Sequence, residues 1–487
     1  MIFLNNETFK WQIIRKFVIN LSESMTTKKA IILIFALGVG AAGAYLIKTE
    51  ADKMYRQVEG PAWLETDSAT AIQKRIESDF RLSRQQLLDA IRENHPEVTD
   101  ADIDRFIAMR YVEVDTINGE QRFFRKSPRN INLLNPDYNG GVKPRGASAS
   151  PQRISYVDSV LSYYKGTNQR GLSHRVTYRF TVDVPGNDVI SDDTITVWMP
   201  VPFDNEECLR QRDVRILNAE PAEYVLSDGK SEHNSICFRV PAPAVGDTAH
   251  FEYVGQFVTS GAYKSPDEIV KSLKPYDKNS QLYKRYTAFD NRHIIRMDSL
   301  AKKIVGDENN PFLCSEKVYD YIIKHYPWAG AREYSTIDCI PQYVLDEGHG
   351  DCGQVSLLYI SLMRTLGIPA RWESGWMLHP GEVNLHDWAE VYFEGVGWMP
   401  VDVSFGRYSN SGNDEIEHFY SHGMDSHRLA ANKNVGQPFF PAKNFVRSET
   451  VDFQVGEVEC SKGNLFYPAW NYNLEVITSE PIEEPLQ

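Results

Sequence analysis

The chain has 487 residues, of which 42% are hydrophobic and 24% charged, so it has the composition of a globular protein and the length for more than one domain. Its formal net charge of −14 argues against a general nucleic-acid binder, because such proteins gather lysine and arginine to contact phosphates. The six cysteines show no CxxC or Cys/His ligand spacing, so a structural zinc site is not expected.

An apolar run without charged residues spans residues 30–47, and Lys28 and Lys29 precede it. Its length is marginal for a bilayer span, and the basic flank favours a cytoplasmic N-terminal end. Residues 1–50 are therefore predicted to hold either a signal peptide, cleaved near Ala42, or an uncleaved transmembrane anchor. Both interpretations predict an extracytoplasmic location, in the periplasm or cell envelope, for the rest of the chain.

Residues 51–130 are predicted to form a small helical unit with a hairpin. Apolar residues recur at helical spacing in three segments, and Asn118-Gly119 is a typical two-residue hairpin turn. Helices followed by a hairpin resemble a winged helix, which would suggest DNA binding. Acidic and basic residues nearly balance here, however, and the unit follows an export signal, so a protein-contact or structural role is favoured.

Residues 131–152 are rich in Asn, Pro, Gly and Ser, show no periodicity and are predicted to be a linker. Residues 153–265 contain short alternating strands punctuated by Gly, Pro and Asp, which is typical of a β-sandwich domain. A disulfide between Cys208 and Cys237 of this region stays open as an alternative for an exported protein.

A thiol is predicted on the first turn of a buried helix. Gly350 allows a sharp entry, Asp351 is a favourable N-cap residue, and Gly367 is a stop signal. The helix body is apolar on nearly every side, which indicates a central position. Cys352 thus lies where free backbone N–H groups and the helix dipole favour a thiolate and can stabilise an oxyanion.

A β-hairpin with Glu394-Gly395 at its tip is predicted to supply the base, because a three-residue loop favours glycine in its last, left-handed position. A hairpin centred on Glu394 places His386 directly opposite Asp402, with both side chains on one face of the sheet. The carboxylate would then orient the imidazole, which would take the thiol proton from Cys352.

Three motifs in this order resemble those of the transglutaminase-like superfamily: Gly350-Asp351-Cys352, His386-Asp387-Trp388 and Trp398-Met399-Pro400-Val401-Asp402. The resemblance covers residues 314–405. It implies an α+β fold with a papain-like transglutaminase core at residues 266–425, preceded by the β-sandwich and the small N-terminal helical unit. Residues 426–487 would be a C-terminal β extension and tail.

The resemblance further implies Cys–His–Asp acyl transfer through a thioester, without a metal ion or other cofactor. Aromatic and amide residues near the motifs are candidates for the oxyanion or substrate contacts, with none assigned: Gln342, Trp328, Tyr334 and Trp388. His418, His422 and His427 lie close together near acidic residues, but their spacing matches no metal-ligand motif, so we expect them to be surface residues.

The function predicted from the sequence is that of a cysteine peptidase or amidase, with hydrolysis favoured over transamidation. Its partners would be a peptide or protein substrate, including cell-wall peptide, and the membrane through residues 30–47, with no nucleic acid. The alternative is a catalytically silent protein that uses the same fold as a binding or scaffold module in the envelope.

Overall fold

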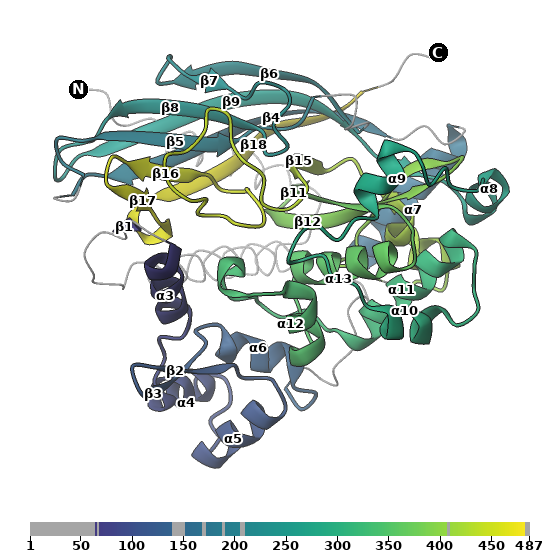
Figure 1. Ribbon diagram of the computed structural model, residues 1–487, viewed down its shortest axis with the longest axis horizontal. Coiled ribbons are helices and arrows are strands. Elements are labelled where there is room, and N and C mark those ends of the chain that lie inside the picture. Colours follow the sequence, from purple (N-terminus) through teal and green to yellow (C-terminus); the bar gives the residue numbers. More distant parts are fainter. Residues whose placement is uncertain are drawn as a thin grey trace, which may run out of the picture. The chain divides into compact units, whose positions relative to one another are not determined.

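The computed structural model describes residues 64–65, 68–138, 151–167, 172–187, 190–204, 210–406 and 410–482 (Figure 1). The described residues all belong to one unit, Ala62–Gln487. The predicted signal peptide or anchor at residues 30–47 and Cys208 therefore lie outside the described residues, whereas Cys237 is a free, buried thiol. Among the helices that the structure describes, none has the length and apolar character needed to cross a membrane.

Two antiparallel sheets form the predicted β-sandwich, seen as the teal and yellow strands of Figure 1. Apolar residues that alternate along the strands meet between the sheets, among them Phe180, Val197 and Val458. The first sheet has the order β18 (Asn471–Ile482), β4 (Ser173–Pro185), β9 (Thr248–Ser260) and β6 (Gln211–Glu220). The second has the order β1 (Leu64–Glu65), β17 (Gly463–Leu465), β16 (Glu457–Cys460), β5 (Thr194–Pro200), β8 (Ser235–Pro241) and β7 (Val225–Leu226).

The C-terminal strands are part of this sandwich and do not form a separate extension. β18 pairs along its length with β4, and β16 pairs with β5. Sequence pattern detects each strand but not its partner, because these pairings join segments that are hundreds of residues apart.

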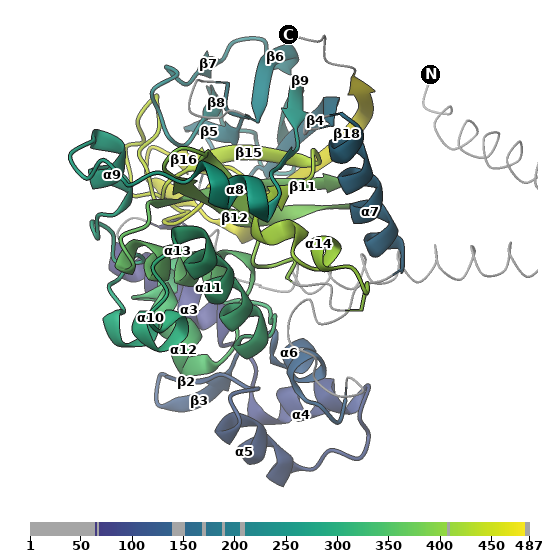
Figure 2. The same ribbon diagram turned by 90° about the vertical axis from the view of Figure 1, so that its right-hand side faces the viewer.

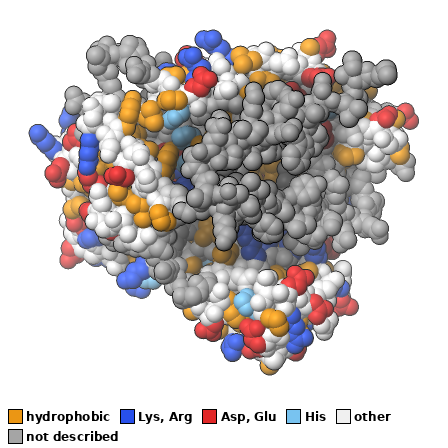
Figure 3. Space-filling model, turned by 180° about the vertical axis from the view of Figure 1, so that it is seen from behind, with side chains coloured by type: hydrophobic (Ala, Val, Ile, Leu, Met, Phe, Trp, Pro, Cys, Tyr) orange, Lys and Arg blue, Asp and Glu red, His pale blue; other side chains and the backbone are white. Residues whose placement is uncertain are grey.

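The small helical unit contains three helices, a hairpin and a fourth helix: α3 (Ser68–Asp79), α4 (Arg84–Arg92), α5 (Asp100–Ala108), β2 (Val114–Ile117), β3 (Glu120–Phe123) and α6 (Ser127–Leu134). Asn118 and Gly119 both have positive φ, as the predicted turn requires. On the face seen in Figure 3, this unit carries acidic and basic side chains next to one another. That mixture matches the balanced composition that argued against DNA binding.

The predicted linker is shorter than expected, because helices enter it from both ends. α6 continues to Leu134, and α7 (Pro151–Gly166) begins before residue 152. Tyr164 of α7 packs in one apolar cluster with Trp388 and Phe419, so α7 lies against the catalytic region (Figure 2).

The small helical unit is docked onto the segment that leads to Cys352. Asn130 exchanges two hydrogen bonds with the backbone of Gly330, at 2.8 and 3.0 Å, and Lys126 Nζ donates to the carbonyl of Ala331. The backbone N–H of Glu333 donates to Asp79 Oδ2 at 2.6 Å. These bonds give the unit a structural role beside the site.

The core is α+β, as expected, with a four-stranded sheet in the order β13 (Gly397–Val401), β12 (Glu382–Phe393), β11 (Ala370–His379) and β15 (Arg428–Lys433). Helices of the core are α10 (Asp298–Val305), α11 (Pro311–His325), α12 (Ile340–Glu347) and α13 (Cys352–Thr365). The central α13 packs on Ala389 and Val391 of β12. Since β15 follows residue 425, the sheet extends beyond the predicted boundary of this domain.

The hairpin register differs from the predicted one by two residues. Phe393 pairs with Gly397 and Ala389 with Val401, so the loop is Glu394–Val396 and Asp402 follows the end of β13. Gly395 and Gly397 both have positive φ, which moves the turn one residue along the chain. A shift of two preserves the face of every side chain, because strand side chains alternate with period two.

Candidate active site

Cys352 is the first residue of α13, as predicted. The Asp351 side chain accepts a hydrogen bond from the Gln354 N–H, and the Gln354 side chain accepts one from the Asp351 N–H, so a capping box closes the helix start. Gly350 is held from the other side by a parallel bridge to Trp328. The thiol is therefore fixed on a buried helix whose N–H groups can receive an oxyanion.

The thiol of Cys352 meets a carboxyl group. Its Sγ lies 3.4 Å from Asp387 Oδ2, and Asp387 Oδ1 accepts a hydrogen bond of 2.8 Å from Gln454 Nε2. Burial, together with Asp387 and Asp351, raises the pKa of the Cys352 thiol well above its usual range. The expected low-pKa thiolate is thus not favoured here, because burial and the nearby carboxyl groups oppose the effect of the helix dipole.

Asp387 is buried among other acidic groups. Burial, then Asp452 and Asp351, raise the pKa of Asp387 well above its ordinary value. Burial likewise raises the pKa of Asp452, to about 7. Sequence analysis treated Asp387 only as the middle residue of a motif. The sequence did carry a signal for this role of Asp387. It lies two residues before Ala389, so strand alternation places it on the same side of β12, the side that faces α13.

His386 and Asp402 form the predicted pair, with 2.7 Å between His386 Nε2 and Asp402 Oδ2. Arg428 Nη1 lies 2.9 Å from the same carboxylate oxygen. The other oxygen accepts the backbone N–H groups of Ser404 and Phe405, at 3.0 and 3.1 Å. The carboxylate is therefore held by three hydrogen-bond donors and by an ion pair with Arg428, in a fully buried position.

The charges of this pair follow from their surroundings. Burial lowers the pKa of His386 although Asp402 opposes the shift, so the imidazole is neutral at neutral pH. Burial tends to raise the pKa of Asp402, but His386 and Arg428 hold it below its ordinary value. The neutral imidazole thus donates from Nε2 to an ionised carboxylate, and Nδ1 is the nitrogen that can accept a proton.

The structure brings His386 to Asp402 and Cys352 to Asp387. Among the described residues, no hydrogen bond or ion pair joins Cys352 to His386. Successive side chains of β12 point to opposite faces, so Asp387 faces α13, while His386 on the other side stacks with Trp388 and meets Phe405 edge to face. A proton transfer from the thiol to the imidazole requires the thiol to leave Asp387.

Two of the four oxyanion or substrate candidates lie beside the start of α13. Trp328 bridges Gly350, and the Tyr334 hydroxyl donates to Asp351 Oδ1. Gln342 is exposed on α12, where its side chain bonds Asp346. Trp388 is fully buried, and its Nε1 donates to Glu373 Oε2 at 2.6 Å, so no surface remains for a substrate.

The three histidines expected on the surface are placed differently. His422 and His427 are buried, at 1% and 6% exposure, and His418 is partly buried. The His422 ring packs against Phe312 and Tyr263 from distant parts of the chain. Polar composition suggested exposure, whereas the long-range packing of this segment removes it from water.

Comparison with known proteins identifies the class of this core. Residues 298–403 match the family model described as the transglutaminase-like superfamily, which contains all three sequence motifs. The resemblance to the transglutaminase-like superfamily is thus confirmed for this segment of the chain.

Two curated relatives share part of the sequence. The uncharacterized protein YebA of Bacillus subtilis is 29% identical over 170 residues, which are 30% of this chain and 23% of that protein. An uncharacterized protein of Haemophilus influenzae is 28% identical over 139 residues, 22% of this chain and 37% of that protein. The chain thus aligns with only about a quarter to a third of the length of these relatives.

Solved structures with some likeness include a candidate cysteine protease from Cytophaga hutchinsonii, with a TM-score of 0.42, 16% identity, and coverage of 65% of this chain and 93% of that one. The periplasmic domain of TgpA from Pseudomonas aeruginosa has a TM-score of 0.20 and 13% identity, covering 57% of this chain and 97% of that one.

Proposed function

We propose that this chain is an exported or membrane-anchored cysteine hydrolase that cleaves peptide amide bonds through a thioester on Cys352. The observation that carries the proposal is the 2.7 Å hydrogen bond between His386 and Asp402, formed within a segment of the transglutaminase-like superfamily. A neutral imidazole oriented by a buried, ionised carboxylate is the arrangement that a general base requires.

In the proposed reaction, substrate binding displaces the Cys352 thiol from Asp387 and turns it toward His386 Nδ1. The thiol proton passes to the imidazole, an S–C bond forms at the substrate carbonyl, and the oxyanion is stabilised by N–H groups at the start of α13. The C–N bond then breaks, and the imidazolium gives its proton to the leaving amine. Water, deprotonated by His386, cleaves the thioester and releases the acid.

Hydrolysis is preferred in this proposal because water can accept the acyl group without a second binding site. The acyl segment of a peptide or protein substrate would lie along the start of α13, beside Trp328 and Tyr334. Cell-wall stem peptides are one proposed substrate of this class, because an exported enzyme would encounter them. No nucleic-acid substrate is proposed, in view of the net charge of −14.

The second candidate is a catalytically silent binding or scaffold module. It is favoured by one observation, the contact of Cys352 with Asp387 and the raised pKa of the thiol. A buried, protonated thiol held by a carboxyl group is a poor nucleophile until it moves.

Incubation of the protein with a mixed peptide library and purified peptidoglycan, followed by mass spectrometry, separates the two candidates. Peptide products formed by wild type and lost in both Cys352→Ala and His386→Ala would support the hydrolase. A mass gain of about one unit at glutamine would indicate deamidation, and crosslinks would indicate transamidation. If no Cys352-dependent product forms, the binding module becomes the better proposal. Cys339→Ala, which removes a partly exposed cysteine elsewhere, is the matched control.

The proposed location rests on the apolar run at residues 30–47 and its basic flank. In a bacterial host, we expect residues after Lys48 to be digested by protease added to spheroplasts, while a cytoplasmic marker protein stays intact. Full protection in spheroplasts that become sensitive after lysis would overturn the location without bearing on the chemistry.

A further inference from the structure

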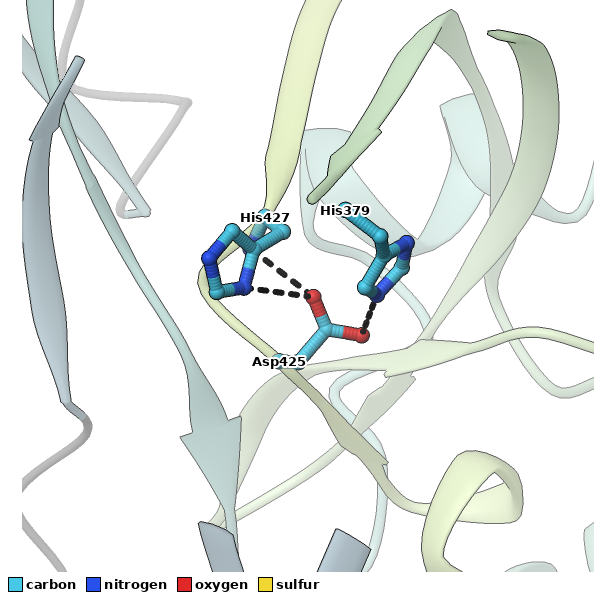
Figure 4. A group of neighbouring side chains, drawn as sticks. All are labelled: His379, Asp425 and His427. Carbon is cyan, nitrogen blue, oxygen red and sulfur yellow. Dashed lines mark hydrogen bonds and ion pairs between the residues drawn. The ribbon is translucent and has the colours of Figure 1, made fainter. Parts of the chain in front are cut away.

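A second group of chemically active side chains lies on the same side of the core sheet as His386. His379 ends β11, and Asp425 and His427 lie in the segment between β14 (Gly423–Met424) and β15. Their potential ligand atoms all lie within 4.8 Å of one another, and all three residues are buried. Figure 4 shows the two imidazoles flanking the Asp425 carboxylate, one on each side.

The imidazole of His379 lacks an adequate partner in this position. Its Nε2 lies 3.1 Å from Asp425 Oδ2, but neither ring nitrogen makes a hydrogen bond of acceptable geometry, although the residue is only 5% exposed. A buried polar atom without a partner is costly, and it indicates either strain or a missing ligand. The ring is directed at the carboxylate and not at a carbonyl or hydroxyl group.

We propose that His379, Asp425 and His427 bind one divalent transition-metal ion of the zinc class. Two imidazoles and a carboxylate are a donor set that suits such ions, with a fourth position left for water or another oxygen. Tetrahedral zinc with nitrogen and oxygen ligands at about 2.1 Å places these ligands roughly 3.4 Å apart. The 3.1 Å and 3.9 Å separations of Asp425 oxygens from His379 Nε2 and His427 Nδ1 are close to that value.

Neighbouring groups hold the proposed ligands in place. Asp425 Oδ2 accepts a hydrogen bond of 2.9 Å from the Tyr420 hydroxyl, and Oδ1 accepts the His427 N–H at 2.8 Å. The hydroxyl of Tyr156 lies 2.7 Å from His427 Nδ1, so this hydrogen bond has to give way when the nitrogen binds an ion. A metal site requires ligand side chains that are held in orientation by hydrogen bonds from neighbouring groups.

Arg428 is the neighbour that opposes a cation, because its Nη2 lies 3.3 Å from Asp425 Oδ2. The same guanidinium also lies beside Asp402, so one positive charge is shared between two buried carboxylates. Asp425 Oδ1, which has the His427 N–H as its hydrogen-bond donor, keeps a second lone pair for an ion. The local charge of the carboxylates and Arg428 therefore remains negative before an ion binds.

A surface hollow lies next to the proposed site. Tyr156 lines a hollow on α7 together with Pro151, Gln152, Ser155 and Ser159, with a volume of about 490 Å³. The hollow thus reaches the residue whose hydroxyl contacts His427.

The test is zinc binding by the full chain, measured after chelation with EDTA and re-addition of ZnCl₂. For wild type we expect one tightly bound zinc per chain by elemental analysis after desalting, and a melting temperature that zinc raises and EDTA lowers. His379→Gln and His427→Gln should each weaken zinc binding by at least about tenfold and abolish the zinc-dependent shift.

His422→Gln is the matched control, because it removes a buried histidine of the same region that lies outside the proposed ligand set. It should bind zinc as wild type does, and circular dichroism checks the fold of each variant. The proposal is overturned if wild type retains no stoichiometric zinc, or if His379→Gln folds and binds zinc as tightly as wild type. Because these readouts are stoichiometry and melting temperature, they are independent of the proposed hydrolase activity.

Discussion

At the scale of single residues, the candidate site contains two pairs of side chains, His386 with Asp402 and Cys352 with Asp387. The carboxyl groups of the two pairs have opposite pKa shifts. Asp402 is ionised because His386 and two backbone N–H groups donate hydrogen bonds to it and the Arg428 guanidinium lies beside it. The pKa of Asp387 is raised, because burial and the neighbouring carboxyl groups of Asp452 and Asp351 outweigh the donors that it has. The first pair is suited to orient a base, whereas the second is suited to hold a thiol in a resting position.

Asp402→Asn tests the first pair. The amide can no longer accept the His386 Nε2–H with the strength of a carboxylate, so the imidazole loses its orientation and its tautomer. We expect turnover of a cleaved peptide to fall by about 10²- to 10⁴-fold while the fold is retained. Steady-state kinetics and circular dichroism measure the two effects. Wild-type turnover in this variant would show that Asp402 does not orient the base.

Asp387→Asn tests the second pair. The substitution removes a carboxyl group that raises the pKa of the Cys352 thiol, so alkylation of Cys352 by iodoacetamide should begin at lower pH than in wild type. Mass-spectrometric labelling rates, measured over a pH series that extends into the alkaline range, compare the two proteins. Cys237, whose pKa burial raises to about 12, is an internal control that should stay slow in both proteins.

The wild-type result is also informative. In the resting protein, preferential labelling of Cys352 at pH 6 is not expected, because the thiol is protonated. An unchanged alkylation midpoint in Asp387→Asn would mean that burial alone sets the thiol pKa.

At the scale of elements, β12 separates two chemical environments. Its side chains toward α13 are Asp387 and the apolar Ala389 and Val391, whereas those on the opposite face include Trp388 and Glu390. Glu390 belongs to a buried charge network with Arg371, whose Nε donates to Glu390 Oε2 at 2.6 Å. Arg371 also lies over the Trp398 ring, 4.1 Å from its centroid. This network fixes β11 to the β12–β13 hairpin that carries His386.

Arg371→Met should therefore destabilise the fold strongly. The apolar stem is kept, but the buried Glu390 carboxylate loses its hydrogen-bonded cation and keeps only the more distant Arg210, so we expect a loss of about 3–5 kcal/mol in the free energy of unfolding. Arg296→Met, which breaks an exposed pair with Asp298, should have a far smaller effect, because water screens the pair. Urea unfolding of both variants makes the comparison, and equal effects would contradict a structural role for the buried network.

At the scale of the whole molecule, buried ionisable groups join the small helical unit to the catalytic core. Glu113 of the helical unit is 9% exposed and lies beside Arg332, Tyr343 and Glu347 of the core. Burial raises the pKa of Glu113 to about 7. Its charged form is therefore disfavoured in the folded chain, where the two parts meet.

Glu113→Gln should make the protein more stable at alkaline pH. An unfolded glutamate ionises near its ordinary value of about 4.3, so wild-type stability declines as the pH rises from that value to about 7, where folded Glu113 ionises. Glutamine avoids this loss, and we expect a gain of about 1–3 kcal/mol at pH 8 and almost none at pH 4.5. Urea unfolding at the two pH values measures it, and a gain of equal size at both would contradict the assigned pKa.

Local features of the core could be predicted from sequence because neighbouring residues encode them. The cap of α13 at Asp351, the left-handed turn at Asn118-Gly119 and the alternation of β12 each depend on a few adjacent side chains. The presence of His386 and Asp402 on one face also follows from alternation alone, and a register shift of two residues leaves it unchanged.

The tertiary structure alone decided which distant groups meet. It placed Asp387, and not His386, next to Cys352, and it inserted β16 and β18 into the two sheets of the sandwich. It also gathered His379 with Asp425 and His427, whose separation in sequence matches no ligand motif. Such meetings depend on packing summed over the whole core, so no short stretch of sequence carries enough of the free energy to reveal them.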